Sequence, residues 1–144
     1  MKMGGCFLYS GTKKPVSSNF ERIRMLLRSE VVKKEASMQR IRNHLVGVDQ
    51  GSVVLFSDFE HDGKMWTGDG PRLHRKKIKL SEAFRAAPVI QVSISMWDIG
   101  QDTNQRADIS AEKVTEIGFE IVFRTWGDTR VARIRADWLA IGEL

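Results

Sequence analysis

The chain has 144 residues, 28% charged and 42% hydrophobic, which is typical of one ordinary globular domain. It holds no run of 18 apolar residues, which excludes a membrane-spanning helix, and its single cysteine excludes an intrachain disulfide. The net charge of +5 is unevenly placed. Residues 1–48 hold ten Lys/Arg against three Glu (+7), and residues 49–144 hold thirteen Lys/Arg against fifteen Asp/Glu (−2). The body therefore lacks the basic balance of a nucleic-acid-binding domain.

Residues 1–40 are expected to form a disordered or partly helical basic extension. Ser18 and Glu21 fit a capping box, and the apolar residues after them fall on a rough heptad. A trimerising coiled coil is one interpretation, and a frayed helix or basic arm is the other. The start lacks the apolar segment of a signal peptide, and nothing hydrophobic precedes the lipoprotein-like box at Met3–Cys6. We expect a cytoplasmic or non-classically exported protein and leave the compartment open.

Residues 41–144 are expected to form an all-β domain, because apolar and polar residues alternate with period two between turn signals. The predicted strands cover residues 45–56, 74–80, 88–97 and 106–114, followed by two more between Gly118 and Gly142. Polar loops rich in Gly and Asp separate them, the longest at residues 57–72. Six strands with these spacings predict an antiparallel β-sandwich.

The last two strands are expected to form a hairpin within Gly118–Gly142. A two-residue turn at Gly127-Asp128 would align their apolar residues on one face and place Glu120 opposite Arg135 on the other. Trp126 would then lie on the wet face beside the turn, where packing does not require it.

The loop after the first strand contains a partial calcium-binding pattern. Asp58, Glu60, Asp62, Gly63 and Asp69 occupy positions 1, 3, 5, 6 and 12 of a D-x-D-x-D-G-type loop. The flanking helices of such a site are absent, so an acidic solvated loop is the main interpretation. No nucleophile elbow or base–nucleophile pair is visible, so an enzyme is the least expected class.

Three of the four tryptophans lie near strand ends or in loops, beside charged residues: Trp66, Trp97 and Trp126. An aromatic ring can cover the apolar face of a pyranose while charged groups bond its hydroxyls, so this pattern favours sugar recognition. Tryptophan and arginine also anchor protein interfaces, which keeps a protein-binding surface open. Trp138 falls in the apolar register of the last strand and is expected in the core.

Several residue groups in the body, taken together, resemble the H-type lectin domain, the family of snail agglutinins and of the C-terminal domain of slime-mould discoidins. The groups are Gly51 to Asp69, Asn104-Gln105-Arg106, Gly118-Phe119, Thr125-Trp126 and Asp137 to Ile141. The resemblance covers roughly residues 45–143. It implies a six-stranded sandwich that assembles as a homotrimer, acts in adhesion, and binds galactose or N-acetylgalactosamine without a metal or other cofactor.

The resemblance also implies a binding site. Asp69 matches the acid that bonds sugar hydroxyls, Arg106 the arginine beside the sugar, and Trp126 the tryptophan at the mouth of the site. Gly68 lies beside that acid, one residue from the family's glycine, whose own position is Thr67. Gly127 replaces a histidine of the snail lectins, which removes a contact.

Two functional hypotheses follow. The first is a trimeric carbohydrate-binding domain whose site contains Asp69, Arg106, Trp126, Gly68 and Gly127, with glycans as partners. The second is a structural or protein-interaction module of a phage-tail-like or cell-surface assembly that does not bind sugar. Binding of galactose and N-acetylgalactosamine discriminates between them.

Overall fold

The protein is represented by a computed structural model that describes residues 38–41 and 45–144. The predictions for residues 1–37 therefore lie outside the described residues, and the domain boundary near residue 40 stays a prediction. Within the described part of the chain, no helix is long and apolar enough to cross a membrane.

The described body contains six strands, as the alternating pattern predicts. They are β1 (Val46–Ser57), β2 (Arg72–Lys79), β3 (Val89–Ile99), β4 (Asp108–Thr115), β5 (Gly118–Thr125) and β6 (Val131–Glu143). Two short helical turns, η1 (Phe59–His61) and α2 (Lys64–Thr67), interrupt the long loop between β1 and β2, where no helix was expected.

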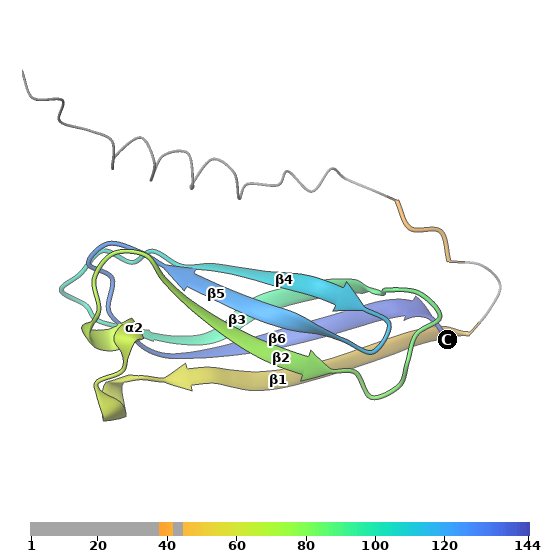
Figure 1. Ribbon diagram of the computed structural model, residues 1–144, viewed down its shortest axis with the longest axis horizontal. Coiled ribbons are helices and arrows are strands. Elements are labelled where there is room, and N and C mark those ends of the chain that lie inside the picture. Colours follow the sequence, from red (N-terminus) through yellow and green to blue (C-terminus); the bar gives the residue numbers. More distant parts are fainter. Residues whose placement is uncertain (1–37, 42–44) are drawn as a thin grey trace, which may run out of the picture. The chain divides into compact units, whose positions relative to one another are not determined.

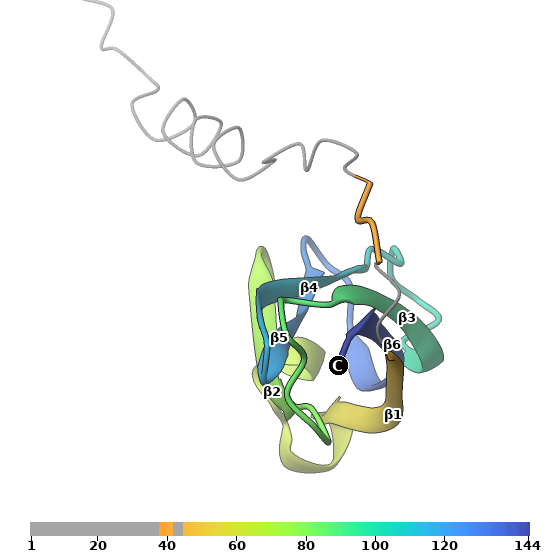
Figure 2. The same cartoon turned by 90° about the vertical axis from the view of Figure 1, so that its right-hand side faces the viewer.

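The strands form two antiparallel three-stranded sheets, ordered β1-β6-β3 and β2-β5-β4. Figures 1 and 2 show these sheets stacked as two layers, with β6 central in one and β5 central in the other. The predicted antiparallel β-sandwich is thus confirmed. Each sheet turns one face inward, which is why apolar residues alternate along the strands.

The core lies between the two central strands. Ile121 and Phe123 of β5 and Ile134 and Ala136 of β6 are fully buried. Trp138 packs edge-on against a β5 ring, that of Phe119, with their centroids 5.4 Å apart. The predicted core role of Trp138 is confirmed, although part of its surface remains accessible.

The predicted hairpin within Gly118–Gly142 is wrong. β5 pairs with β2 and β4, β6 pairs with β1 and β3, and the turn between them crosses from one sheet to the other. Both apolar sets do face the same core, but from opposite layers. Period-two alternation reports which face of a strand is buried and does not report which strand it bonds.

Glu120 accordingly has partners other than Arg135. Its carboxylate lies 3.2 Å from Arg75 of β2 and 3.1 Å from Lys113 of β4. Arg75 also reaches Glu112 of β4 at 2.6 Å, which carries an ion pair across the central strand β5. These side chains cover Val122, an outward-facing residue that is nevertheless 0% exposed.

The outer face of the β1-β6-β3 sheet carries an apolar cluster near the end of β6, which we call the far-end patch. It consists of Val46, Val48, Val89, Leu139 and Ile141. In the register of the sheet, Ile141 lies between Val48 and Val89, which are 62% and 54% exposed. Small polar and charged residues take over this face toward the start of β6. The patch thus occupies one end of the sheet.

Candidate functional site

Three loops gather at the other end of the sandwich, where β5 ends and β6 begins (Figure 1). They are residues 58–71 between β1 and β2, residues 100–107 between β3 and β4, and residues 126–130 between β5 and β6. All five predicted site residues lie in these loops. We call this surface the loop end.

Arg72, the first residue of β2, holds two of these loops together. Its side chain is buried, and each of its five N–H groups donates to a backbone carbonyl. The acceptors are Gly70 (3.1 Å), Met65 (3.1 Å), Gly68 (2.8 Å), Gly127 (3.0 Å) and Thr129 (2.6 Å). One planar cation thereby fixes the α2 segment against the β5–β6 turn.

Burial lowers the pKa of the Arg72 guanidinium, and the negative charge of Asp69 opposes that change. An arginine remains charged in proteins, so the carbonyl dipoles and Asp69 together must compensate a buried cation. Sequence reasoning missed Arg72. In the sequence it is simply an arginine after Gly70-Pro71, and only the fold reveals its five acceptors.

Arg106 lies against the β5–β6 turn. Its Nη1 donates to the Asp128 carboxylate at 2.6 Å, and Asn104 donates to the same carboxylate at 3.1 Å. These hydrogen bonds hold the pKa of Asp128 below its ordinary value, and the bond from Arg106 has the largest effect. Asp128 therefore stays ionised to lower pH than usual and keeps Arg106 oriented there. Asp128 is a site residue that the sequence suggested only as a turn former.

Gly127 lies close to the same Arg106 guanidinium. Its backbone has φ +64°, a conformation that favours glycine, and a Cβ there would lie 3.0 Å from the Arg106 Nη1. The positive φ agrees with the turn predicted at Gly127-Asp128, and the closeness of Arg106 is a second reason for glycine that the sequence did not give. A side chain would be strained and would press on the arginine.

Asp69 and Gly68 stand on the neighbouring loop. The Asp69 side chain is exposed and accepts no hydrogen bond from any other residue that the structure describes. The next residue, Gly70, donates to the Gly127 carbonyl at 3.1 Å, which places the Asp69 loop beside the β5–β6 turn. Gly68 has a backbone role, because a Cβ there would overlap the Lys64 carbonyl and lie 2.9 Å from the Arg72 Cδ.

Trp126 lies at the same turn and is 44% exposed. Thr129, which is fully buried, donates its hydroxyl to the Trp126 carbonyl at 3.0 Å. The preceding residue, Thr125, donates to the Arg106 carbonyl at 2.7 Å and so ties the loop 100–107 to the end of β5. The tryptophan backbone is fixed while its ring remains accessible.

The calcium alternative is not supported in residues 38–41 and 45–144. No group there of three or more His, Cys, Asp or Glu side chains could hold a metal ion. Asp58 instead accepts a hydrogen bond from the Met65 N–H at 2.9 Å, and a Cβ at Gly63 would overlap the Asp58 carboxyl group. The Asp58 carboxylate of the acidic loop therefore bonds a backbone N–H of the same loop.

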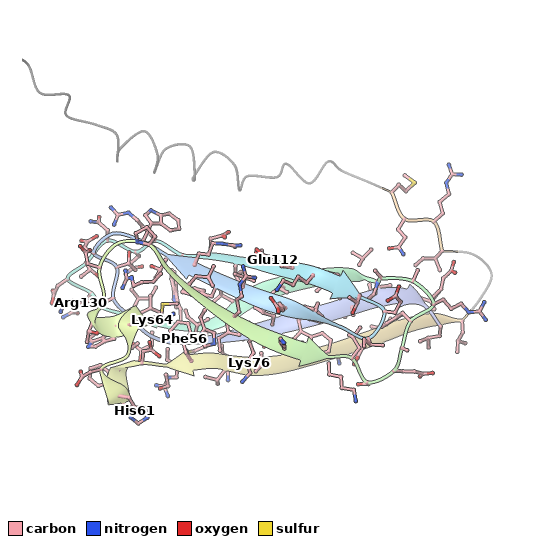
Figure 3. All side chains as sticks on the ribbon, in the orientation of Figure 1. Phe56, His61, Lys64, Lys76, Glu112 and Arg130 are labelled. Atoms are coloured by element: carbon pink, nitrogen blue, oxygen red, sulfur yellow. The ribbon has the colours of Figure 1, made fainter. Side chains whose placement is uncertain are left out.

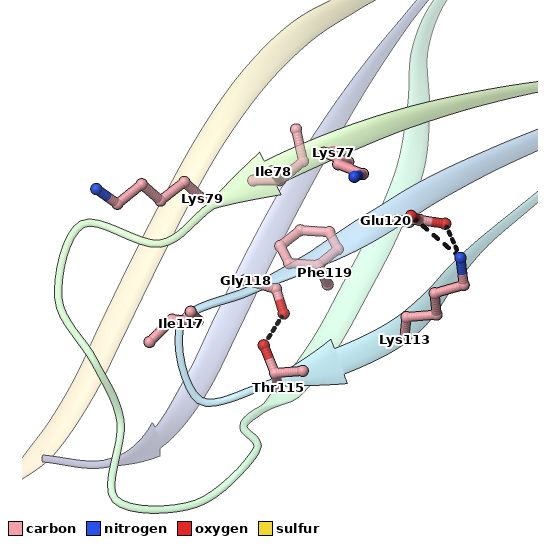
Figure 4. Close-up of a pocket in the computed structure, with 9 residues that line it drawn as sticks. All are labelled: Lys77, Ile78, Lys79, Lys113, Thr115, Ile117, Gly118, Phe119 and Glu120. Atoms are coloured by element: carbon pink, nitrogen blue, oxygen red, sulfur yellow. Dashed lines mark hydrogen bonds and ion pairs between the residues drawn. The ribbon is translucent and has the colours of Figure 1, made fainter.

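An open depression of about 360 Å³ lies at the opposite end of the sheet β2-β5-β4, around the β4–β5 turn (Figure 4). Lys77, Lys79 and Lys113 line it together with Ile117 and other residues of these strands. Lys113 is engaged by Glu120, as Figure 4 shows. None of the predicted site residues lines this depression, so the loop end remains the candidate site.

The described body is an antiparallel β-sandwich with its candidate site in three loops at one end. Residues 75–141 match the family model described as the H-type lectin domain. Over residues 75–141 the chain thus belongs to the H-type lectin domain family.

Similar proteins support this assignment. The chain is 32% identical over 75 residues to a discoidin-1 polypeptide of Dictyostelium discoideum, an alignment covering 51% of this chain and 30% of that protein. The solved structure of discoidin II from the same organism has a TM-score of 0.62 at 21% identity and shares the fold, covering 75% of this chain and 40% of that one. The chain thus spans less than half the length of the discoidins.

A further relative comes from Fuscovulum blasticum and is named ATP synthase subunits region ORF 7. It is 58% identical over 99 residues, which cover 69% of this chain and 86% of that protein.

Replacing Arg72 by lysine should destabilise the protein by about 2–4 kcal/mol, because lysine keeps the charge but cannot donate to five fixed carbonyls. Denaturant unfolding monitored by tryptophan fluorescence measures this. Arg85→Lys, at an exposed position, is the control and should change stability by less than about 0.5 kcal/mol. Equal stability of both variants would contradict the role assigned to Arg72.

Replacing Gly127 by alanine should cost about 1 kcal/mol of stability through its positive φ and should also displace Arg106. Gly70→Ala is a matched control, since Gly70 has φ +72° but no atom within 4 Å of its Cβ position. Denaturant unfolding should report similar losses for both. The NMR signal of the Arg106 Nε–H should shift only in Gly127→Ala, and a shift of equal size in both variants would count against the contact.

Proposed function

We propose that the loop end binds a sugar of the galactose or N-acetylgalactosamine type. The supporting observation is a pair of complementary polar groups on adjoining loops. Asp69 offers a carboxylate that accepts no hydrogen bond from another described residue. Within the same part of the chain, Arg106 uses only one of its N–H groups for a side-chain partner, Asp128. Acceptor and donors of this kind suit the hydroxyl groups of a pyranose.

In this proposal the three side chains have different tasks. Asp69 accepts hydrogen bonds from sugar hydroxyls, and Arg106 donates to sugar oxygens from the orientation that Asp128 sets. Trp126 covers the apolar C–H face of the ring. Gly68 and Gly127 let the backbone approach closely and leave the Arg106 guanidinium uncovered. Because the charges that bond the sugar come from side chains, binding requires no metal.

Pre-organisation supports the proposal. The carbonyl of Gly127 accepts hydrogen bonds from both Arg72 and the Gly70 N–H, so the loops of Asp69 and Trp126 are joined before any ligand arrives. A rigid site loses less conformational entropy on binding, which matters for a small polar ligand with few apolar contacts.

We further propose that the domain assembles as a homotrimer, as the family resemblance implies. The far-end patch supports this, since a contiguous exposed apolar surface usually marks an interaction site. Its central residues, Val48, Ile141 and Val89, carry no charge and come from all three strands of one sheet. Three copies of such a face can meet around a three-fold axis without like-charge repulsion.

The same patch favours the second candidate function, a structural module. In that version the domain would contribute contacts to a larger assembly and would be indifferent to sugars. Sugar binding at the loop end distinguishes the two candidate functions, because only the lectin function depends on Asp69 and Arg106.

Asp69→Ala and Arg106→Ala should each weaken sugar binding at least about tenfold, because each removes a hydrogen bond to a charged group. Calorimetric titration with galactose and with N-acetylgalactosamine measures this. Asp102→Ala removes another exposed carboxylate from the loop 100–107 and should leave affinity unchanged. If the unmodified protein binds neither sugar, nor any glycan on an array, the lectin proposal is wrong and the structural module is favoured.

Replacing Val48 or Val89 by lysine should dissociate the assembly, because a charge at an apolar contact is desolvated without a partner. Light scattering after size-exclusion chromatography gives the oligomeric state. Ser93→Lys places the same charge on the polar part of the same face and should leave the assembly intact. A monomer in all forms, the unmodified protein included, would contradict the trimer while leaving the sugar site open.

A further inference from the structure

An aromatic pair stands on the loop 58–71, the same loop that carries Asp69 of the proposed sugar site. Phe59 of η1 and Trp66 of α2 meet edge to face, with ring centroids 5.0 Å apart. Phe59 is nevertheless 59% exposed, and Trp66 is only partly buried. The pair therefore presents a wide apolar surface to solvent, beyond what its internal contact uses.

The pair is continuous with the loop that carries Arg106. The six-membered ring of Trp66 approaches Gly100, with two of its carbons 3.6 Å from the position of a Gly100 Cβ, and the Arg130 Cβ lies 3.3 Å from that position. Backbone bonds reinforce this junction, because the Gly100 N–H donates to the Arg130 carbonyl at 2.8 Å. Trp66, which belongs to the same loop as Asp69, thus lies against Gly100, the first residue of the loop 100–107.

Arg130 adds a free donor group to this surface. It lies between Thr129 and the first residue of β6, is exposed, and has no side-chain hydrogen bond or ion pair with another described residue. Figure 3 shows Arg130 and Lys64 at the loop end of the sandwich, where the proposed sugar site lies. An aromatic platform beside an uncommitted guanidinium repeats the chemistry of Trp126 and Arg106.

We propose that Phe59, Trp66 and Arg130 form a second saccharide subsite, which holds the next ring of an oligosaccharide whose terminal sugar occupies the first site. The proposal rests on the proposed function and deepens it, because it makes the ligand an oligosaccharide. The second ring packs on Phe59 and the exposed part of Trp66, and Arg130 donates to its hydroxyl oxygens.

The two subsites share a rigid support. Met65, the neighbour of Trp66, and Thr129, the neighbour of Arg130, both give their carbonyls to Arg72. The same guanidinium also bonds Gly127 in the first site. Occupation of both subsites by one ligand therefore needs no rearrangement of the loops, and the second ring adds its contacts to a surface already in place.

The test compares affinities in calorimetric titrations of the full chain. The probes are N-acetylgalactosamine and a panel of disaccharides that carry it at the non-reducing end and differ in linkage and second hexose. At least one disaccharide should bind about 3- to 10-fold more tightly than the monosaccharide, the gain of one aromatic contact with a hydrogen bond.

The variants Phe59→Ser and Arg130→Ala should each lose most of this gain while keeping the affinity for the monosaccharide. Ile117→Ser is the control, because it removes an apolar side chain of similar exposure at the other end of β5. Thermal unfolding of each variant confirms that the domain is folded. As a second readout, tryptophan emission should change on adding the disaccharide more than the monosaccharide, and Trp66→Phe should remove that difference.

The outcomes are distinct. Monosaccharide binding with no gain for any disaccharide overturns the second subsite and leaves the lectin function standing. A gain that survives both Phe59→Ser and Arg130→Ala also overturns it. Failure of the unmodified protein to bind any of these sugars or any glycan on an array overturns both the subsite and the function on which it rests.

Discussion

The loop end depends on one buried cation. Among the described residues no carboxylate is hydrogen-bonded to Arg72. Its charge is met by five carbonyl oxygens from two segments that are distant in the sequence. Because every acceptor is backbone, the arginine constrains the paths of the chain and leaves the neighbouring side chains uncommitted. Asp69 and Trp126 can therefore remain exposed and still be held in place. A salt bridge in the same position would have engaged a carboxylate side chain of the loop.

Polar side chains reinforce the sandwich outside its core as well. The Arg75–Glu112 pair crosses β5 and shields Val122 from water, so the outer face of that sheet combines charge with buried apolar area. Within residues 38–41 and 45–144, no ion pair covers the far-end patch on the other sheet. The two outer faces thus differ in kind: one is closed by ion pairs, and the other keeps valines in solvent.

The sequence predicted the six strands and the sandwich because burial on one side leaves a period-two record in each strand. It could not predict that β5 and β6 belong to different sheets, since two layers facing one core leave the same record as two neighbours in one layer. The predicted site residues do lie at one end of the fold. Arg72 and Asp128 were missed because their importance comes from backbone carbonyls and loop neighbours, which no local pattern encodes.

The length of β6 has a geometric consequence. This strand begins at Val131 beside the loops and ends at Glu143 beside the far-end patch, so it separates the two surfaces by the full extent of the sheet. Copies joined side by side through the patch in a closed ring would keep their loops unobstructed and pointing the same way. If each loop end binds a ligand as proposed, several sites would then engage one ligand-bearing surface together, and modest individual affinities would combine into a larger one.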